Sequence, residues 1–305
     1  MSTPAARPGR ALSSAAFLTL LLIALIMAAN HVAARFAFND GVDVTTAVAT
    51  RSAATAAVVA LLIALQRVAW QTTPRQRRLL PVIGLLIAVQ SYCLYSAVAR
   101  LPVALALLAF NSFPIATAAW QWLLYRQRPP RVLLLLMPVI LLGLALALDV
   151  AGAASGLGAA GQWQRIGTGV AFALGAALTF GLALVLTQHE TQGMDGRVRS
   201  CATMGIVAVL ATIALAAQGG PHWPSSSTGW WGLALLALLY GTGITILFTV
   251  LPRLGVAANS PIMNVEPIFA LLLAWALLGQ SIAPVQVLGA VVVVAAVMAL
   301  GLRRA

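Results

Sequence analysis

The chain has 305 residues, of which 61% are hydrophobic and only 8% are charged, and its mean hydropathy is +0.97. Soluble domains carry about 25% charged residues, so this composition excludes a soluble protein and indicates a membrane protein with lipid as its main solvent. The net charge is +12, but the basic residues fall in short gaps between apolar runs and form no basic patch interleaved with aromatic residues. This pattern argues against nucleic acid as a partner.

Ten segments of the chain are long and apolar enough to cross a bilayer, which takes about 20 residues of helix. In chain order they are roughly 13–34, 45–66, 79–99, 101–125, 132–150, 166–187, 199–218, 229–252, 256–279 and 284–303. Because lipid cannot satisfy backbone polar groups, we expect each segment to be a helix. The first follows two arginines, as a signal peptide would, but its length leads us to expect a retained transmembrane helix.

The arginines predict how these helices are oriented. All 18 basic residues are Arg, and with the N-terminus in the cytoplasm most of them lie in cytoplasmic gaps. The exceptions are Arg35, Arg100 and Arg165 on the outer side and Arg51 inside a predicted helix. Cytoplasmic loops of membrane proteins carry an excess of Arg and Lys. We therefore expect both chain ends in the cytoplasm and an even number of crossings.

An internal repeat underlies the ten segments. The sequence from Arg100 can be laid on the sequence from Arg253 without a gap, and this alignment pairs identical residues at several positions, among them Asn111 with Asn264, Pro114 with Pro267 and Trp122 with Trp275. Each half then has five crossings, and an odd number makes the second copy enter the membrane from the opposite side. Such inverted repeats are frequent among secondary transporters.

The fold expected from these patterns is an all-α integral membrane protein with ten transmembrane helices in two inverted five-helix repeats. The first repeat is expected at residues 1–150 and the second at 163–305. A Gly/Ala-rich connecting loop is expected at 151–162.

Two stretches carry a resemblance to a known family: RLPVALALLAFNSFPIATAAWQWLLYRQRP in the first half and GVAANSPIMNVEPIFALLLAWALLGQ in the second. With the two five-helix halves, they resemble the bacterial EamA-type permeases of the drug/metabolite transporter superfamily, over essentially the whole chain. Arg51 looks like an arginine that the family has in its second helix. The family often has Glu just after its fourth and ninth helices, where this sequence has Gln127 and Gln280, so a carboxylate role is not available at those two positions.

The resemblance implies a secondary transporter for a small molecule, in a bacterial inner (cytoplasmic) membrane, that works by alternating access through a cavity between the halves. Because relatives include amino-acid exporters, amino acids are the leading substrates and export the expected direction. Protons are a candidate coupling ion, no cofactor is implied, and monomer and homodimer both stay open. The alternatives are a permease for another metabolite or drug, a channel, or an intramembrane enzyme.

The last two alternatives find little support in the residues. A channel filter would need a ring of like charges, which the sequence does not suggest. An enzyme would need a nucleophile–base pair or metal ligands at membrane depth, and no such cluster can be drawn around the three histidines or around Cys93 and Cys201. We therefore expect neither an enzyme nor a metal site.

Glu266 is the acid that needs an explanation, because ionisable groups inside a membrane are costly. It lies well inside the segment 256–279, where a lone carboxylate is expected to be protonated or paired. One reading makes it a contact for a substrate amine or a proton-coupling site. The other pairs it with Arg51 or has it serve a helix break at Pro267.

Arg51, His31 and Asn30 are further candidates for substrate binding. Arg51 lies about two turns into the second predicted helix, where its guanidinium could hold a substrate carboxylate or phosphate in a bidentate fork. A structural role, paired with Asp40 or Asp43 in the preceding loop, is the alternative. Asn30 and His31 lie in the outer half of the first helix, and His31 is either a buried hydrogen-bonding group or a proton carrier.

The prolines and tyrosines complete the candidate site. Pro114 and Pro267 predict kinks at equivalent places, and proline-interrupted segments at matching positions point to a transporter's binding site. Asn111 and Asn264, one turn earlier, either contact substrate or satisfy the freed backbone. Tyrosines complete a candidate substrate-binding set as either cavity-lining or helix-packing residues: Tyr92 and Tyr95, three residues apart and so expected on one helix face, and Tyr240.

Overall fold

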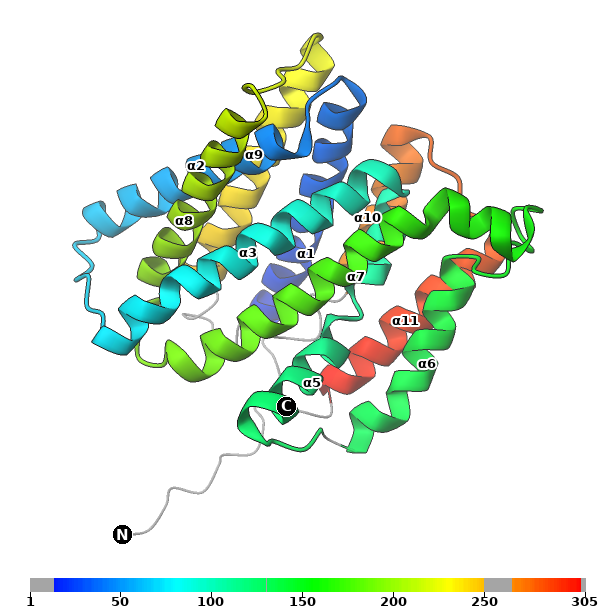
Figure 1. The fold of residues 1–305 in the computed structure, drawn as a ribbon, viewed down its shortest axis with the longest axis horizontal. Coiled ribbons are helices and arrows are strands. Elements are labelled where there is room, and N and C mark those ends of the chain that lie inside the picture. The colour runs from blue at the N-terminus through cyan, green and yellow to red at the C-terminus, as the bar shows by residue number, and fades with distance from the viewer. Residues whose placement is uncertain (1–13, 130, 250–264, 303–305) are drawn as a thin grey trace.

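The computed structural model describes residues 14–129, 131–249 and 265–302, and its regular structure is helical (Figure 1). The described residues form eleven helices: α1 (Ser14–Asn39), α2 (Val44–Leu65), α3 (Pro74–Arg100), α4 (Val103–Phe110), α5 (Phe113–Tyr125), α6 (Arg131–Ala147), α7 (Gly158–Glu190), α8 (Gly196–Ala217), α9 (Ser227–Thr249), α10 (Glu266–Leu278) and α11 (Pro284–Leu302).

The longer helices have the length and the surface of membrane-spanning segments. Within the described residues, six spans are long and apolar enough to cross a bilayer, and one of them, Val103–Tyr125, combines α4 and α5. Large apolar side chains on the outside of the bundle, such as Leu61, Leu135 and Trp231, are mostly exposed. Because water would penalise so much exposed apolar surface, the lateral surface suits a lipid environment.

The packing of the helices has a two-fold pattern. The closest pairs are α3 with α7, α1 with α9, α2 with α8 and α6 with α11, and Figure 1 shows α3 beside α7 and α6 beside α11. The two halves correspond helix by helix: α1 to α7, α2 to α8, α3 to α9, α5 to α10 and α6 to α11. Exchanging each helix for its counterpart turns the pair α3–α7 into α9–α1 and the pair α5–α7 into α10–α1, while the pairs α2–α8 and α6–α11 map onto themselves.

Hydrogen bonds between helix ends define two opposite faces of the bundle. On the Asp40 face, Asp40 after α1 accepts from the Ser226 amide before α9 at 2.8 Å, and Gln162 in the first turns of α7 donates to Leu148 O after α6 at 3.0 Å. On the Glu190 face, the end of α7 meets the start of α3 through Glu190 and Arg75. Since α1 ends on the Asp40 face and its counterpart α7 begins there, the two halves run in opposite directions.

The segment 101–125, expected as one helix, is interrupted in its middle. α4 ends at Phe110, Asn111 and Ser112 form a turn, and α5 begins at Phe113 with Pro114 as its second residue. A proline in the first helical turn costs no hydrogen bond, because the amides there have no partner within the helix. Where the sequence predicted a kink, the structure therefore has a break.

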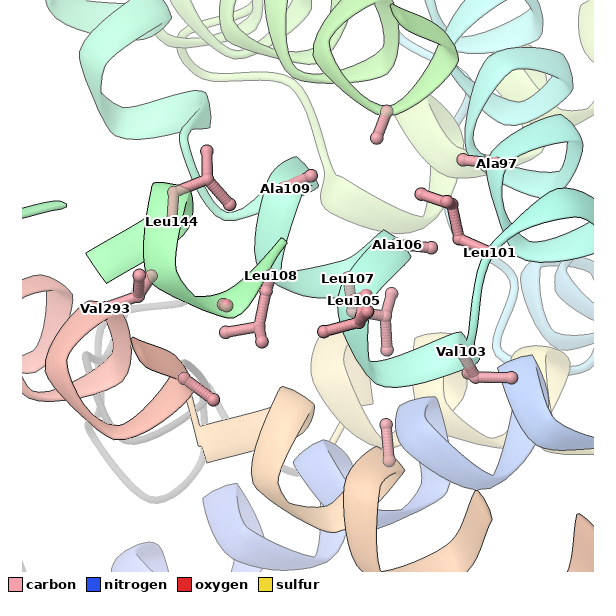
Figure 2. Packing of buried hydrophobic residues seen from close by; sticks show 14 of the residues in the cluster. Ala97, Leu101, Val103, Leu105, Ala106, Leu107, Leu108, Ala109, Leu144 and Val293 are labelled. Atoms are coloured by element: carbon pink, nitrogen blue, oxygen red, sulfur yellow. The ribbon is translucent and has the colours of Figure 1, made fainter. Parts of the chain in front are cut away.

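The short helix α4 is the centre of the main hydrophobic core. Its residues from Val103 to Ala109 are all buried. Figure 2 shows the side chains of Val103 and of Leu105 to Ala109 between Ala97 and Leu101 on one side and Leu144 of α6 and Val293 of α11 on the other. Because protein surrounds α4, the break that follows it is sheltered from lipid, as irregular backbone in a membrane must be.

Other element boundaries differ from the expected ones for local reasons. α3 begins at Pro74 instead of 79, because Thr73 and Gln76 form a capping box that starts a helix in the polar stretch read as a loop. α7 begins at Gly158, so part of the expected loop 151–162 is helical. Pro267 is the second residue of α10, and the preceding residues 250–264 lie outside the described part of the chain.

Candidate functional site

Polar side chains from five helices meet inside the bundle, and Tyr95 of α3 is their centre. Its ring is fully buried, and its hydroxyl accepts hydrogen bonds from Asn30 Nδ2 of α1 at 3.0 Å and from Arg51 NH1 of α2 at 3.2 Å. The imidazole of His31 packs against the same ring, with centroids 5.5 Å apart. These residues, together with Ser91 of α3, Tyr240 of α9 and Glu266 of α10, are called the Tyr95 cluster below.

Arg51 is held by neutral groups. The residue is 3% exposed, its NH2 donates to Ser91 Oγ at 2.8 Å, and its guanidinium carbon lies 3.9 Å from the centre of the Tyr240 ring and 4.9 Å from that of Tyr95. An arginine over an aromatic face gains a cation–π attraction that grows when water is excluded. The cluster thus places a fixed positive charge between α2, α3 and α9.

The acid pairings expected for Arg51 do not occur. Glu266 contacts His31 instead, Asp40 binds Ser225 and Ser226 beyond the end of α1, and the Asp43 carboxylate accepts from the amides of Thr45 and Thr46 as the N-cap of α2. Both aspartates accept hydrogen bonds from backbone amides at helix starts. These amides have no partner within the helix and bind a carboxylate in place of an arginine. Sequence proximity was therefore the wrong guide to the partners of Arg51.

Glu266 contacts His31 across the two halves. Glu266 Oε1 lies 3.4 Å from His31 Nε2. The carboxylate is not in the middle of a helix, as the sequence suggested, but on the first residue of α10. The positive end of the helix dipole favours a carboxylate at that position. The Glu266 side chain keeps a quarter of its surface exposed, whereas His31 is buried and its Nδ1 has no hydrogen-bond partner among the described residues.

The counterpart of Glu266 in the first half is apolar. α5 begins at Phe113 where α10 begins at Glu266, and the Phe113 ring packs with Phe110 and Phe180 at centroid distances of 5.5 and 5.2 Å. The equivalent helix starts of the two repeats thus carry opposite chemistry, a carboxylate in one half and an aromatic cluster in the other.

Two of the expected site residues, Tyr92 and Asn111, do not join the Tyr95 cluster in the described structure. Tyr92 is 46% exposed and packs edge-on against Phe172, so it does not share the environment of Tyr95 three residues later. Asn111 is buried at the turn between α4 and α5, where its backbone N–H donates to Leu107 O. Asn264 lies outside the described residues.

Ser91 is a member of the cluster that the sequence reasoning did not single out. It precedes Tyr95 by one helical turn on α3, so both side chains lie on the same face, and both contact Arg51. The i, i+4 spacing from a suspected site tyrosine was the signal that would have found it.

Two hollows lie on the outside of the bundle, away from the cluster. A groove of about 930 Å³ runs between α3 and α8, lined by Trp70, Leu80 and Ile206 among others. A smaller pocket of about 560 Å³ on the Asp40 face includes Tyr92 and Arg100. Neither of these two hollows is lined by a residue of the Tyr95 cluster.

The fold and the cluster define a class: an all-helical membrane protein of two repeats with ionisable groups in its interior. A family model described as "EamA-like transporter family" matches residues 14–148 and again residues 167–302. The chain belongs to this family, which confirms the resemblance seen in the sequence and makes a membrane transporter the class that the findings support. A transporter family is also consistent with the expectation that the chain is not an enzyme.

Comparison with other known proteins adds the fold but no activity. No curated protein matches the chain. Among 17 matching chains of solved structures is a crystal structure described only as that of a protein, with a TM-score of 0.60 and 16% identity, covering 95% of this chain and 98% of its own. At this level of identity, the likeness shows a shared fold over nearly the whole length of both chains.

Proposed function

We propose that the chain is a secondary transporter that exports small metabolites, amino acids first among them, by alternating access between its two halves. The observation that carries this proposal is the Tyr95 cluster. Polar and ionisable groups in a membrane interior are costly and mark the path of a solute or an ion. Both halves contribute to the cluster, α1 to α3 from the first and α9 and α10 from the second, so movement between the halves would open it.

Amino acids are favoured because the cluster offers both charges that an amino acid needs. At neutral pH an amino acid carries a carboxylate and an ammonium group, and the cluster contains the guanidinium of Arg51 and the carboxylate of Glu266. Export as the direction rests on the family resemblance. The Glu266–His31 contact is proposed to take the substrate amine or a transported proton, since carboxylates and imidazoles inside membrane proteins mark solute and proton pathways.

We further propose ten membrane crossings in two inverted five-helix repeats. In this arrangement α4 and α5 form one crossing, and α10 forms another with the segment before it. The Glu190 face, which holds Arg75 and Arg197, is then cytoplasmic according to the bias of the arginines. Both chain ends lie on that side, in a bacterial inner membrane.

Counterflow in proteoliposomes tests the carrier function. Vesicles loaded with an unlabelled amino acid should accumulate the same radiolabelled amino acid transiently, because a carrier exchanges solute across the membrane without a channel's continuous pore. Asn30→Ala, which removes a hydrogen bond to Tyr95, should slow counterflow, whereas Tyr92→Phe, outside the cluster, should not. Channel-like conductance without counterflow for any solute in a broad panel would reject the carrier.

A further inference from the structure

Arg51 is a buried cation for which the described part of the chain supplies no anion in direct contact. The sequence contains six acidic residues, and the structure describes all of them. Their partners lie elsewhere: Asp40 binds Ser225 and Ser226, Asp43 binds Thr46, Asp149 binds Ala154 and Ser155, Glu190 binds Arg75, Asp195 binds Arg197, and Glu266 binds His31. No side-chain carboxylate oxygen of these six described residues lies within 4.0 Å of an Arg51 guanidinium nitrogen.

The neighbours of Arg51 orient its charge without neutralising it. Ser91 and Tyr95 each accept one hydrogen bond through a neutral oxygen, and the rings of Tyr95 and Tyr240 offer their faces. A guanidinium cannot release its proton to escape the cost of burial. Among the residues that the structure describes, its Nε–H has no hydrogen-bond partner. The site therefore holds a positioned cation with an unused hydrogen-bond donor. The charge of this cation is compensated only when an anion binds.

We propose that Arg51 is the binding site for the carboxylate of the transported solute, an inference that rests on the proposed carrier function. A carboxylate is planar, presents two oxygens to the guanidinium fork and brings one negative charge against one positive charge. A phosphate monoester carries nearly two charges at neutral pH and would leave the buried site negative. The chemistry of a single arginine thus selects a monoanionic carboxylate.

The position of Arg51 connects the carboxylate to the transport cycle. The guanidinium comes from α2 of the first half and lies under the ring of Tyr240 from α9 of the second half, so relative movement of the halves uncovers it. Tyr95 acts as a positioning residue: its hydroxyl bonds NH1 and is itself fixed by Asn30 of α1. The solute then replaces neutral contacts at the buried charge by an ion pair.

The first test compares matched solutes on the wild-type protein in proteoliposomes. Counterflow is measured for an amino acid, its amide, the corresponding decarboxylated amine and a phosphate monoester, and the comparison is repeated for an aliphatic and an aromatic side chain. Loss of a hydrogen-bonded charge contact typically weakens binding roughly 10- to 100-fold. We therefore expect the acid to exchange about 10- to 100-fold better than its amide or amine. Equal exchange of acid and amide, or preference for the phosphate ester, overturns the proposal.

The second test asks whether Arg51 produces the preference. Arg51→Gln should bring the acid-to-amide ratio close to one, and Arg51→Lys, which keeps the charge but loses the fork, should give an intermediate ratio. Tyr95→Phe should reduce the ratio because it releases NH1, whereas Tyr92→Phe should retain the wild-type ratio. An unchanged ratio in Arg51→Gln overturns the proposal.

These outcomes separate the inference from the carrier function. If Arg51→Gln does not fold, the wild-type comparison decides by itself. If amides and amines exchange as well as acids, the chain remains a carrier and the carboxylate site is wrong. If no solute shows counterflow, both the carrier function and the carboxylate site are rejected.

Discussion

The crossing of α6 and α11 allows a stringent test of the packing, through the substitution Gly289→Ala. Gly289 of α11 is buried against the backbone of α6. A Cβ at this position would lie 2.4 Å from Ala147 N and 2.6 Å from Gly143 O. Small residues at a helix crossing let backbones approach closely in membranes, where no hydrophobic force drives helices together. Adding one methyl group should therefore push the two helices apart.

The size of the effect follows from these distances. Ordinary contacts of a Cβ begin at 3.4 Å, so α11 would need to move by about 1 Å, and the obstructing atoms are backbone that no rotamer change can remove. Overpacking of this kind costs about 1–3 kcal/mol. Alanine also favours a helix over glycine by about 1 kcal/mol. Gly205→Ala in α8, where nothing lies within 4 Å of the added Cβ, measures that gain without the clash.

The assay is reversible unfolding of both variants in mixed micelles with increasing denaturing detergent. We expect the free energy of unfolding of Gly289→Ala to fall about 1–3 kcal/mol below that of Gly205→Ala, because the propensity gain is common to both. Counterflow should also be lost earlier on heating. If the two variants are equally stable, α6 and α11 do not pack at the described distance and the reasoning fails.

Glu266→Gln should abolish uphill transport driven by a pH gradient and leave exchange largely intact if Glu266 carries the proton; unchanged pH-driven transport in the variant would reject that role. Gln280→Glu should stabilise the protein by about 0.3–1 kcal/mol, because a negative charge is favourable at a helix N-terminus. The Gln280 side chain already accepts a hydrogen bond from the Val103 backbone amide at the start of α4. A lower melting temperature of the variant would contradict this prediction. The pKa of Asp195 at the start of α8 is lowered, chiefly by its hydrogen bond with the Arg197 side chain. Its contribution to stability should therefore be complete at neutral pH and be lost as the pH falls through that lowered pKa. Asp195→Asn should accordingly reduce the loss of stability on acidification in a curve of stability against pH. An unchanged acid side of that curve would argue against the Asp195–Arg197 contact.

The helical, membrane-spanning architecture was predictable because long apolar runs indicate bilayer crossings. Pro114 and Pro267 matched in sequence, and both prove to stand second in a helix. The break at Asn111 was missed because an apolar run looks the same with or without a two-residue turn. Glu266 was placed in mid-helix because its position was counted along the whole apolar segment, whereas α10 begins at Glu266.

The contacts inside the cluster were less predictable than its members. Arg51, Tyr95 and His31 were recognised as costly or polar groups in apolar helices, a property of the sequence alone. Which of them meet depends on how α1, α2, α3 and α10 rotate against each other, and that is decided by packing over whole helices. Charge complementarity suggested an Arg51–Glu266 pair, whereas packing brought Glu266 to His31.

Equivalent pairs of helix ends on the two faces of the bundle are joined by interactions of different kinds. On one face Glu190 binds the guanidinium of Arg75, whose side chain is 75% exposed. On the other, at the corresponding pair of helix ends, Asp40 binds the neutral Ser225 hydroxyl and Ser226 amide. Dissolved ions screen an exposed ion pair but weaken a charge–dipole hydrogen bond far less. Ionic strength therefore acts unequally on the two sides of a protein whose halves share one backbone plan, and salt added on a single side of a vesicle distinguishes them.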